Sequence, residues 1–496
     1  PEAPSASRTN WVEQVSGGTV PNGATQVSFG ETPTDKVVMT LALSAEGLKR
    51  MGLADLRYSY HGHESNSLAS FPEAFVSGMA NNERARILGD AGESHPENWR
   101  WRSADPDSPE WQVSEKPAHA LIIMYGKTRG ALEEGVRAEK TRLRDQFGFD
   151  VGPSIILRDI PEDRNEFREP FGFRDGISQP IIEGTKRARG EKNSIHIVKP
   201  GEFILGYPDN RGDFPHSPVV VQSSAATPDL EARPTNAPNR FPDFNESGAG
   251  QILDFGRNGS FFVMRQLKQY SAEMKTYLEA KAIQLNADYP GLNITADWLA
   301  AKIVGRQKNG LSLLADPSVA EDPDKTPDND FLFGTEDPQG LKCPYGAHIR
   351  RANPRDSLSP KSEYQVEISN RHRLLRRART YVSDRARASC DEANSATVDP
   401  TDGLLFMCFN SDLERQFEFV QQPWMSSSIF HGLDDERAPL ITPRSEAAAV
   451  GTFTIPTAFG SIQLRDLPSF VSVTNGGYFF VPSRAALRFL SKLEPS

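Results

Sequence analysis

The chain has 496 residues, which is too long for one hydrophobic core and long enough for two or three. Its 37% hydrophobic and 25% charged residues are typical of a globular protein. A formal net charge of −10 argues against nucleic-acid binding, which normally needs a basic face, and against docking on anionic lipid. No apolar run approaches the roughly 18 residues of a membrane-spanning helix, and three cysteines cannot form a disulfide framework.

Four segments share one pattern, in which a short apolar run is followed by an amphipathic helical stretch. The runs are 37–43, 120–125, 260–264 and 404–409. After the last run, Ser411 and Glu414 have the spacing of a helix capping box. The next apolar residues recur with the period of a helix that packs on a sheet, and they are Leu413, Phe417 and Val420. This pattern predicts antiparallel sheets covered by helices.

Two of these segments precede residue 200 and two follow residue 255. Between them, residues 207–250 are rich in Pro, Asn, Ser and Asp and show little periodicity, which is typical of a long surface connection. We therefore predict two similar α+β halves, at 1–225 and 256–496, joined by a linker at 226–255.

The first candidate for chemistry is a carboxylate in a turn bracketed by glycines. Asp175 lies between Gly172 and Gly176, and glycine allows backbone angles that would hold the carboxylate in one orientation. An Asp-Gly pair is also a common turn without any function. The neighbouring Phe171 and Phe173 favour function, because a carboxylate among aromatic rings is costly unless it has a partner.

The second candidate is a histidine, His348, in a short apolar stretch with Ala347 and Ile349 that we expect to be a strand. A buried histidine is usually a hydrogen-bonded core residue. A single histidine is nevertheless all that a haem iron requires from a protein.

A third feature is a cluster of arginines between 371 and 379. Alone, such a cluster indicates a basic, solvated face. The apolar pair Leu374 and Leu375 within it suggests instead a strand edge that aims one guanidinium inward.

Together these motifs resemble those of the dye-decolorizing peroxidases. Residues 172–176 match the family's Gly-x-x-Asp-Gly motif, 347–350 resemble its proximal-histidine motif and 374–377 its distal-arginine motif, in the family's order. The resemblance implies an α+β fold of two ferredoxin-like halves, of the dimeric α+β barrel type. It implies haem b bound between the sheet and helices of the second half. The implied activity is reduction of hydrogen peroxide with oxidation of dyes, phenolics and similar bulky one-electron donors.

Carried over by position, the resemblance makes His348 the axial ligand of the haem iron and places Arg350 near a haem propionate. It makes Asp434 the carboxylate that accepts the histidine N–H. Asp435 is a rival, because the Asp-Pro sequence usual in the family is interrupted here. Further residues are implied to line the haem, namely Ile177, Leu404 and Phe406.

In the implied reaction, Asp175 is the general acid–base for peroxide, and Arg376 offsets the negative charge that develops on it. Bulky donors do not reach the iron in such a pocket. Trp424 and Tyr381 are therefore the candidates for surface aromatics that pass electrons inward, with an ordinary packed aromatic as the alternative for each.

Other interpretations stay open. The acidic stretch 321–337 is a candidate Mn(II) site or simply a solvated loop. A non-catalytic haem-binding or haem-transfer protein would use His348 without needing Asp175 or Arg376. A chlorite-degrading enzyme would use a distal arginine without a carboxylate. The joint presence of Asp175 and Arg376 favours the peroxidase, and the family favours an extracellular location over a cytoplasmic one.

Overall fold

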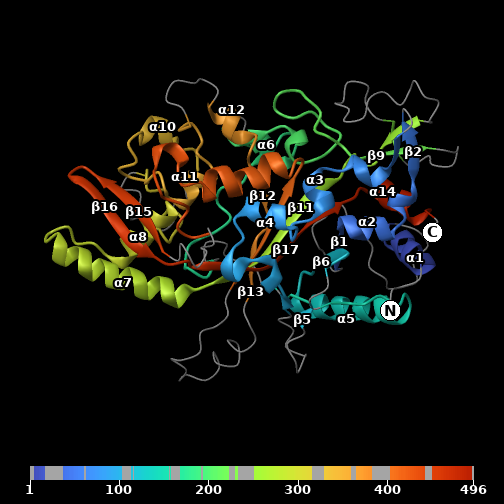
Figure 1. The fold of residues 1–496 in the computed structure, drawn as a ribbon, viewed down its shortest axis with the longest axis horizontal. Coiled ribbons are helices and arrows are strands. Elements are labelled where there is room, and N and C mark those ends of the chain that lie inside the picture. Colours follow the sequence, from blue (N-terminus) through green and yellow to red (C-terminus); the bar gives the residue numbers. More distant parts are fainter. Residues whose placement is uncertain are drawn as a thin grey trace.

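A seven-stranded antiparallel sheet crosses the middle of the molecule (Figure 1). The computed structural model describes residues 5–16, 37–60, 63–102, 113–114, 117–152, 154–155, 157, 168–190, 194–222, 230–232, 251–315, 329–358, 365–381, 403–441 and 450–493. The strands of the sheet, in spatial order, are β12 (Leu375–Arg376), β14 (Gly403–Asn410), β11 (Ser260–Gln269), β17 (Val471–Val481), β1 (Val38–Leu43) and β6 (Ala120–Tyr125), and β13 (Arg379–Tyr381) also pairs with β14.

Five two-stranded sheets surround the central one in the described part of the chain. They are β2 (Arg57–Tyr60) with β3 (His63–Asn66), β4 (Trp101–Arg102) with β5 (Val113–Ser114), β7 (Ile181–Ile182) with β8 (Ile197–Val198), β9 (Val219–Gln222) with β10 (Gln251–Asp254), and β15 (Gly451–Thr457) with β16 (Gly460–Leu467). Only the pairing of β7 with β8 is parallel among these.

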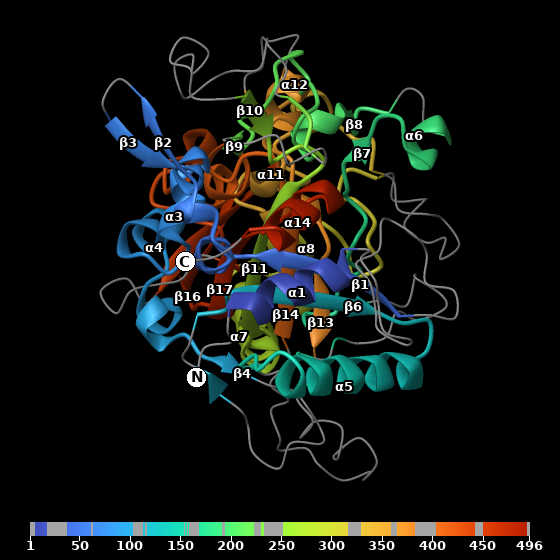
Figure 2. The ribbon, with the colours of Figure 1, turned by 90° about the vertical axis from the view of Figure 1, so that its right-hand side faces the viewer.

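Helices lie at both ends of the long axis and over its middle (Figure 1). The described α-helices are α1 (Ser5–Val15), α2 (Ala45–Arg50), α3 (Glu73–Ser77), α4 (Asn82–Leu88), α5 (Arg129–Asp145), α6 (Lys186–Gly190), α7 (Ser271–Asp288), α8 (Ala296–Val304), α10 (Phe333–Glu336), α11 (His348–Ala352), α12 (Gln365–Asn370) and α14 (Arg484–Ser491). At one end α7 and α8 pack together beside the β15–β16 hairpin; at the other, α1 packs on α14 and α5 runs along β6 (Figure 2). No described helix is long and apolar enough to cross a membrane.

The predicted α+β class with antiparallel sheets is confirmed. All four apolar runs become strands of the central sheet, namely β1, β6, β11 and β14. Strands that precede residue 200 join those that follow residue 255 where Leu43 pairs with Phe480. The division at 226–255 stays a prediction.

The helix after β14 differs from the expected one. It is π-helical over Glu414–Glu418 and Val420–Ser426, and the predicted capping box is not formed. The Gln416 side chain takes its place, accepting the Ser411 N–H at 2.9 Å. The Ser411 hydroxyl donates instead to the Glu202 carbonyl at 3.0 Å, and a Glu414 carboxylate oxygen accepts the N–H of Ala74 at 3.3 Å. Tertiary contacts therefore override the local capping pattern.

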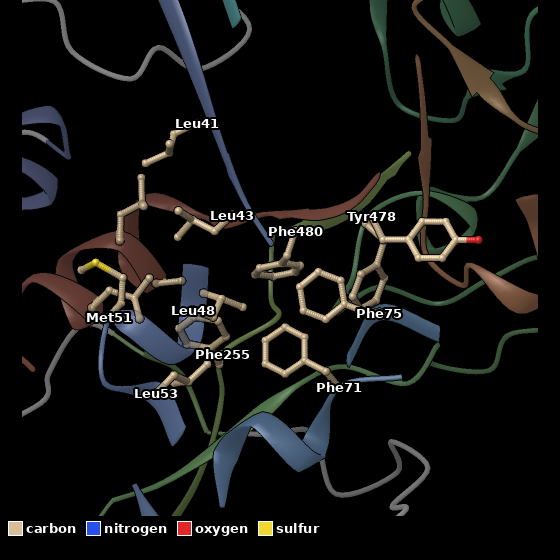
Figure 3. Packing of buried hydrophobic residues seen from close by; sticks show 14 of the residues in the cluster. Leu41, Leu43, Leu48, Met51, Leu53, Phe71, Phe75, Phe255, Tyr478 and Phe480 are labelled. Carbon is tan, nitrogen blue, oxygen red and sulfur yellow. The ribbon is translucent and has the colours of Figure 1, made fainter. Parts of the chain in front are cut away.

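A cluster of phenylalanines joins β11 and β17 to the segments before β4 (Figure 3). Phe480 is fully buried, and its ring centroid lies 5.4 Å from Phe71, 5.8 Å from Phe255 and 5.5 Å from Phe261. Rings at these separations gain from aromatic contact as well as from burial. Phe480 is thus a central member of the main core.

Phe480→Ala is expected to lower the free energy of unfolding by about 3–5 kcal/mol, because it leaves a cavity among closely packed rings. Denaturant unfolding measures this loss. The matched control is Phe459→Ala at the tip of the β15–β16 hairpin, where the side chain is 96% exposed. The control is expected to change stability by less than about 0.5 kcal/mol. Equal effects of the two variants would contradict the assignment of Phe480 to the core.

Candidate active site

The turn that carries Asp175 has the backbone predicted from its glycines. Gly172 and Gly176 have φ values of +90° and +80°, in the region that favours glycine. The Gly176 N–H donates to Asp175 Oδ1 at 2.6 Å. One oxygen of the Asp175 carboxylate is thereby fixed by its own turn.

Arg376 reaches Asp175 from the edge of the central sheet. Its Nη1 lies 3.6 Å from Asp175 Oδ1, and its Nη2 donates to the Ser178 carbonyl at 3.2 Å. The Gln179 side chain accepts the Arg376 backbone N–H at 3.2 Å. The two charged side chains remain 28% and 19% exposed, so they face a partly open space. The structure therefore brings together two residues that the sequence places 201 positions apart.

An apolar wall lies on the same face of the sheet as Arg376. Arg376 pairs with Cys408, and side chains directly opposite in an antiparallel pair share a face. Leu404 and Phe406 alternate with buried residues along β14 and share that face with Cys408. Both are half-buried. The third predicted lining residue, Ile177, lies next to Gly310 on the Asp175 side.

His348 is the first residue of α11 and not part of a strand, as the sequence had suggested. The helix lets the next two arginines be buried with partners: Arg350 lies beside Asp337 with 3.3 Å between Nη1 and Oδ2, and Arg351 donates to the Trp424 carbonyl at 2.7 Å. The sequence around His348 does not reveal these contacts, because their partners lie elsewhere in the chain.

The imidazole of His348 is buried and uncharged. Its Nδ1 is buried without a hydrogen-bond partner, and Nε2 has no hydrogen bond to any part of the chain that the structure describes. The pKa of His348 is lowered to about 4, first by burial and then by the charge of Arg376, while Asp175 acts in the opposite direction. The histidine therefore lies within electrostatic range of both residues and stays uncharged in mildly acidic solution.

Arg350 is buried and held by neighbouring protein groups. It is 1% exposed, donates to the Cys343 carbonyl at 2.8 Å and lies over the Tyr345 ring at 4.5 Å. Its role beside a propionate stays a prediction.

The hydrogen bond expected from His348 to Asp434 is not formed. Asp434 and its rival Asp435 are both exposed, because positive φ values at His431, Gly432 and Asp435 turn this segment outward. Glu436 is turned inward instead, is 5% exposed and accepts the Thr454 N–H at 3.1 Å.

Trp424 and Tyr381 are not surface aromatics. They are 5% and 8% exposed. The Tyr381 hydroxyl donates to the Leu267 carbonyl at 2.7 Å, and the Trp424 ring packs edge-on to Phe419 at 5.3 Å. Both residues are therefore ordinary packed aromatics, which was the alternative interpretation for each.

Of the acidic stretch considered for Mn(II), residues 321–328 lie outside the described residues.

Sequence reasoning missed the significance of one arginine within the basic cluster. Arg373 is 5% exposed, and its Nη1 lies 2.9 Å from His196 Nδ1, whose other ring nitrogen contacts the Asn329 carbonyl at 2.7 Å. Its Nη2 is buried without a partner, and no described carboxylate pairs with it. The pKa of Arg373 is lowered to about 10 by burial and then by Arg376. A buried guanidinium of this kind suits an anionic ligand group.

No family model matches the chain, whereas several curated proteins do. The dye-decolorizing peroxidase msp1 of Mycetinis scorodonius is 28% identical over 339 residues, which cover 64% of this chain and 56% of that protein. The multifunctional dye peroxidase DyP2 of Amycolatopsis sp. is 28% identical over 391 residues, covering 78% and 74%. The dye-decolorizing peroxidase of Mycena epipterygia is 31% identical over 328 residues, covering 63% and 52%. The chain thus spans about half the length of two of these relatives.

Solved structures share the fold. A DyP-type peroxidase of Anabaena sp. superimposes with a TM-score of 0.60 at 22% identity, covering 92% of this chain and 80% of that one. An ancestral D-type dye decolorizing peroxidase gives a TM-score of 0.61 at 24% identity, covering 92% and 86%. In sequence the chain is thus similar to several dye-decolorizing peroxidases, and it shares the fold of solved structures of such enzymes.

Proposed function

We propose that the chain is a haem peroxidase that reduces hydrogen peroxide and oxidises dyes and phenolic donors. The observation that carries the proposal is the Asp175–Arg376 pair, 3.6 Å apart and in electrostatic range of a neutral histidine. The names of the relatives support the same reaction. A haem carrier would need His348 but neither charged residue, so the pair favours the enzyme.

The residues fit a haem group. His348 would ligate the iron, since its imidazole is neutral and its ring nitrogens have no hydrogen-bond partner among the described residues. Arg373, with its unpaired buried Nη2, would bind an acidic side group of the porphyrin. When bound, the haem supplies the redox chemistry, being oxidised by peroxide and reduced again by single electrons from the donor.

Asp175 would move the proton. Its Oδ1 already accepts the Gly176 N–H and faces Arg376, whereas Oδ2 has no partner among the described residues. Oδ2 can therefore take the proton of one peroxide oxygen and return it to the other, which leaves as water.

Arg376 would offset the negative charge that develops on peroxide when Asp175 has removed the proton. Its guanidinium is already oriented by the Ser178 carbonyl and by Asp175, so little reorganisation is needed. Leu404 and Phe406 would limit water and bulky donors at the same face.

The donor site and Mn(II) are separate questions. Because Trp424 and Tyr381 are buried, we do not propose them as points where donors deliver electrons. Mn(II) as a further donor stays a prediction that rests on the acidic composition of 321–337.

Asp175→Asn is expected to lower the second-order rate constant for reaction with hydrogen peroxide by about 10²- to 10⁴-fold, since the amide cannot carry the proton. Stopped-flow absorption of the haem-loaded protein measures this rate. Haem content should not change, because Asp175 is not a ligand. The matched control is Glu183→Gln, which removes a carboxylate that is 51% exposed and paired only with Lys199. A rate equal to that of the control would contradict the role of Asp175.

Haem should stay bound as the pH falls from 7 and be released only near pH 4 or below. The native pKa of His348 is lowered to about 4 from the usual 6.5, so the neutral, ligating imidazole persists through this window and is lost below it. The position of the Soret band during an acid titration follows the release. His348→Ala should bind haem weakly at every pH, with partial recovery in added imidazole. Release between pH 6 and 7 would contradict a desolvated His348 ligand.

A further inference from the structure

A second carboxylate, Glu169, lies inside the turn that presents Asp175. Glu169 Oε1 accepts the N–H of Phe173 at 2.9 Å, and Oε2 accepts the N–H of Phe171 at 3.0 Å. The Gln269 side chain donates to Oε2 at 2.9 Å. Both oxygens are therefore bonded, by three donors from two parts of the chain.

The backbone of Glu169 closes the same turn. Its N–H donates to the Phe173 carbonyl at 2.9 Å, and its own carbonyl accepts the Gly172 N–H at 2.8 Å. The segment from Glu169 to Phe173 thus surrounds the Glu169 carboxylate. Asp175 follows two residues after Phe173, whose carbonyl accepts the Glu169 N–H. Phe173 is 5% exposed and packs in the core cluster that includes α7 and β15.

Gln269 connects this turn to the central sheet. It is the last residue of β11 and pairs with Val471 of β17. Its side chain is buried, so the amide that meets Glu169 has little freedom. The hydrogen bond from Gln269 to Glu169 thereby attaches the turn of Asp175 to the central sheet, and the edge of the same sheet carries Arg376.

The ionised form of Glu169 costs free energy at this buried position. The pKa of Glu169 is raised to about 7 by burial, which outweighs the three hydrogen bonds, and the charge of Asp175 raises it as well. Gln269 Oε1 is buried without a partner among the described residues, so a rotated amide would accept a hydrogen bond from protonated Glu169. Glu169 and Gln269 can thus hold the turn whether Glu169 is ionised or protonated.

We propose that Glu169, held by Gln269, is a positioning residue for Asp175: it fixes the glycine-bracketed turn so that the Asp175 carboxylate faces Arg376. This inference rests on the proposed peroxidase function for its catalytic meaning, although the turn itself can be tested without it. Glutamine at position 169 keeps the size but presents an NH₂ where an acceptor is needed. At least one of the three donors then loses its partner.

The first experiment measures amide hydrogen exchange in the segment 168–176 for the wild type and Glu169→Gln, in the absence of peroxide. Exchange at Phe171 or Phe173, whichever amide faces the new NH₂, is expected to become about five- to tenfold faster, as loss of one hydrogen bond predicts. Glu183→Gln, on the same stretch but exposed, is the matched control and should exchange like the wild type. Unchanged exchange in Glu169→Gln would overturn the proposal.

The second experiment separates positioning from general damage in the haem-loaded protein. For Glu169→Gln, kcat/KM for peroxide is expected to fall by about 10- to 100-fold, as misplacement of a catalytic group predicts. The value of kcat/KM for the reducing donor and the Soret spectrum should stay as in the wild type. An equal loss in both parameters, or no loss in either, would overturn the proposal.

Gln269→Leu provides a second variant should Glu169→Gln fold poorly. It keeps both backbone donors and removes only the tether to the sheet, so a smaller loss in kcat/KM for peroxide, still specific to peroxide, is expected. A wild-type protein that takes up no haem would overturn the proposed function instead. In that case the exchange comparison still decides whether Glu169 holds the turn.

Discussion

Strand β11 hydrogen-bonds along nearly its whole length to β14 on one side and to β17 on the other, and the placement of Asp175 and Arg376 depends on this pairing. Through β14 it fixes β12 and therefore Arg376. Through its last residue, Gln269, it meets the turn of Asp175. Through β17 it reaches Phe480 and the main core. A rigid sheet thus sets the relation between two charged groups that lie far apart in the sequence.

Near the candidate site, the described arginines outnumber the carboxylates that pair with them. Arg373 and Arg376 contribute two guanidinium groups near the site, and the Asp175 carboxylate pairs with only one of them. His348 stays neutral in this field because burial and Arg376 both lower its pKa. Among the described residues, Arg373 thus has no carboxylate partner, and a buried guanidinium without an anionic partner is costly. A haem with acidic side groups and a polarised peroxide would supply such partners.

The sequence was sufficient for the parts of the fold that depend on local pattern. The four apolar runs form strands of the central sheet, and the glycines around Asp175 have the backbone they were expected to allow. The resemblance also pointed to Asp175, Arg376 and His348 before their geometry was known.

What sequence reasoning missed depends on contacts between distant segments. The helical start of α11 follows from the buried partners of Arg350 and Arg351, and the outward turn of Asp434 follows from a run of positive φ values. Burial of Trp424 is likewise a tertiary property. Glu169 carried no signal of its own, because its partners are backbone amides and a glutamine 100 residues away.

The most direct test of the account is the absorption spectrum of the haem-loaded protein before and after one equivalent of hydrogen peroxide. A haem peroxidase should show a Soret band that changes rapidly and returns to its starting form when a dye or phenol is added. A Soret band that does not respond to peroxide would contradict a peroxidase and indicate a haem-binding protein without turnover.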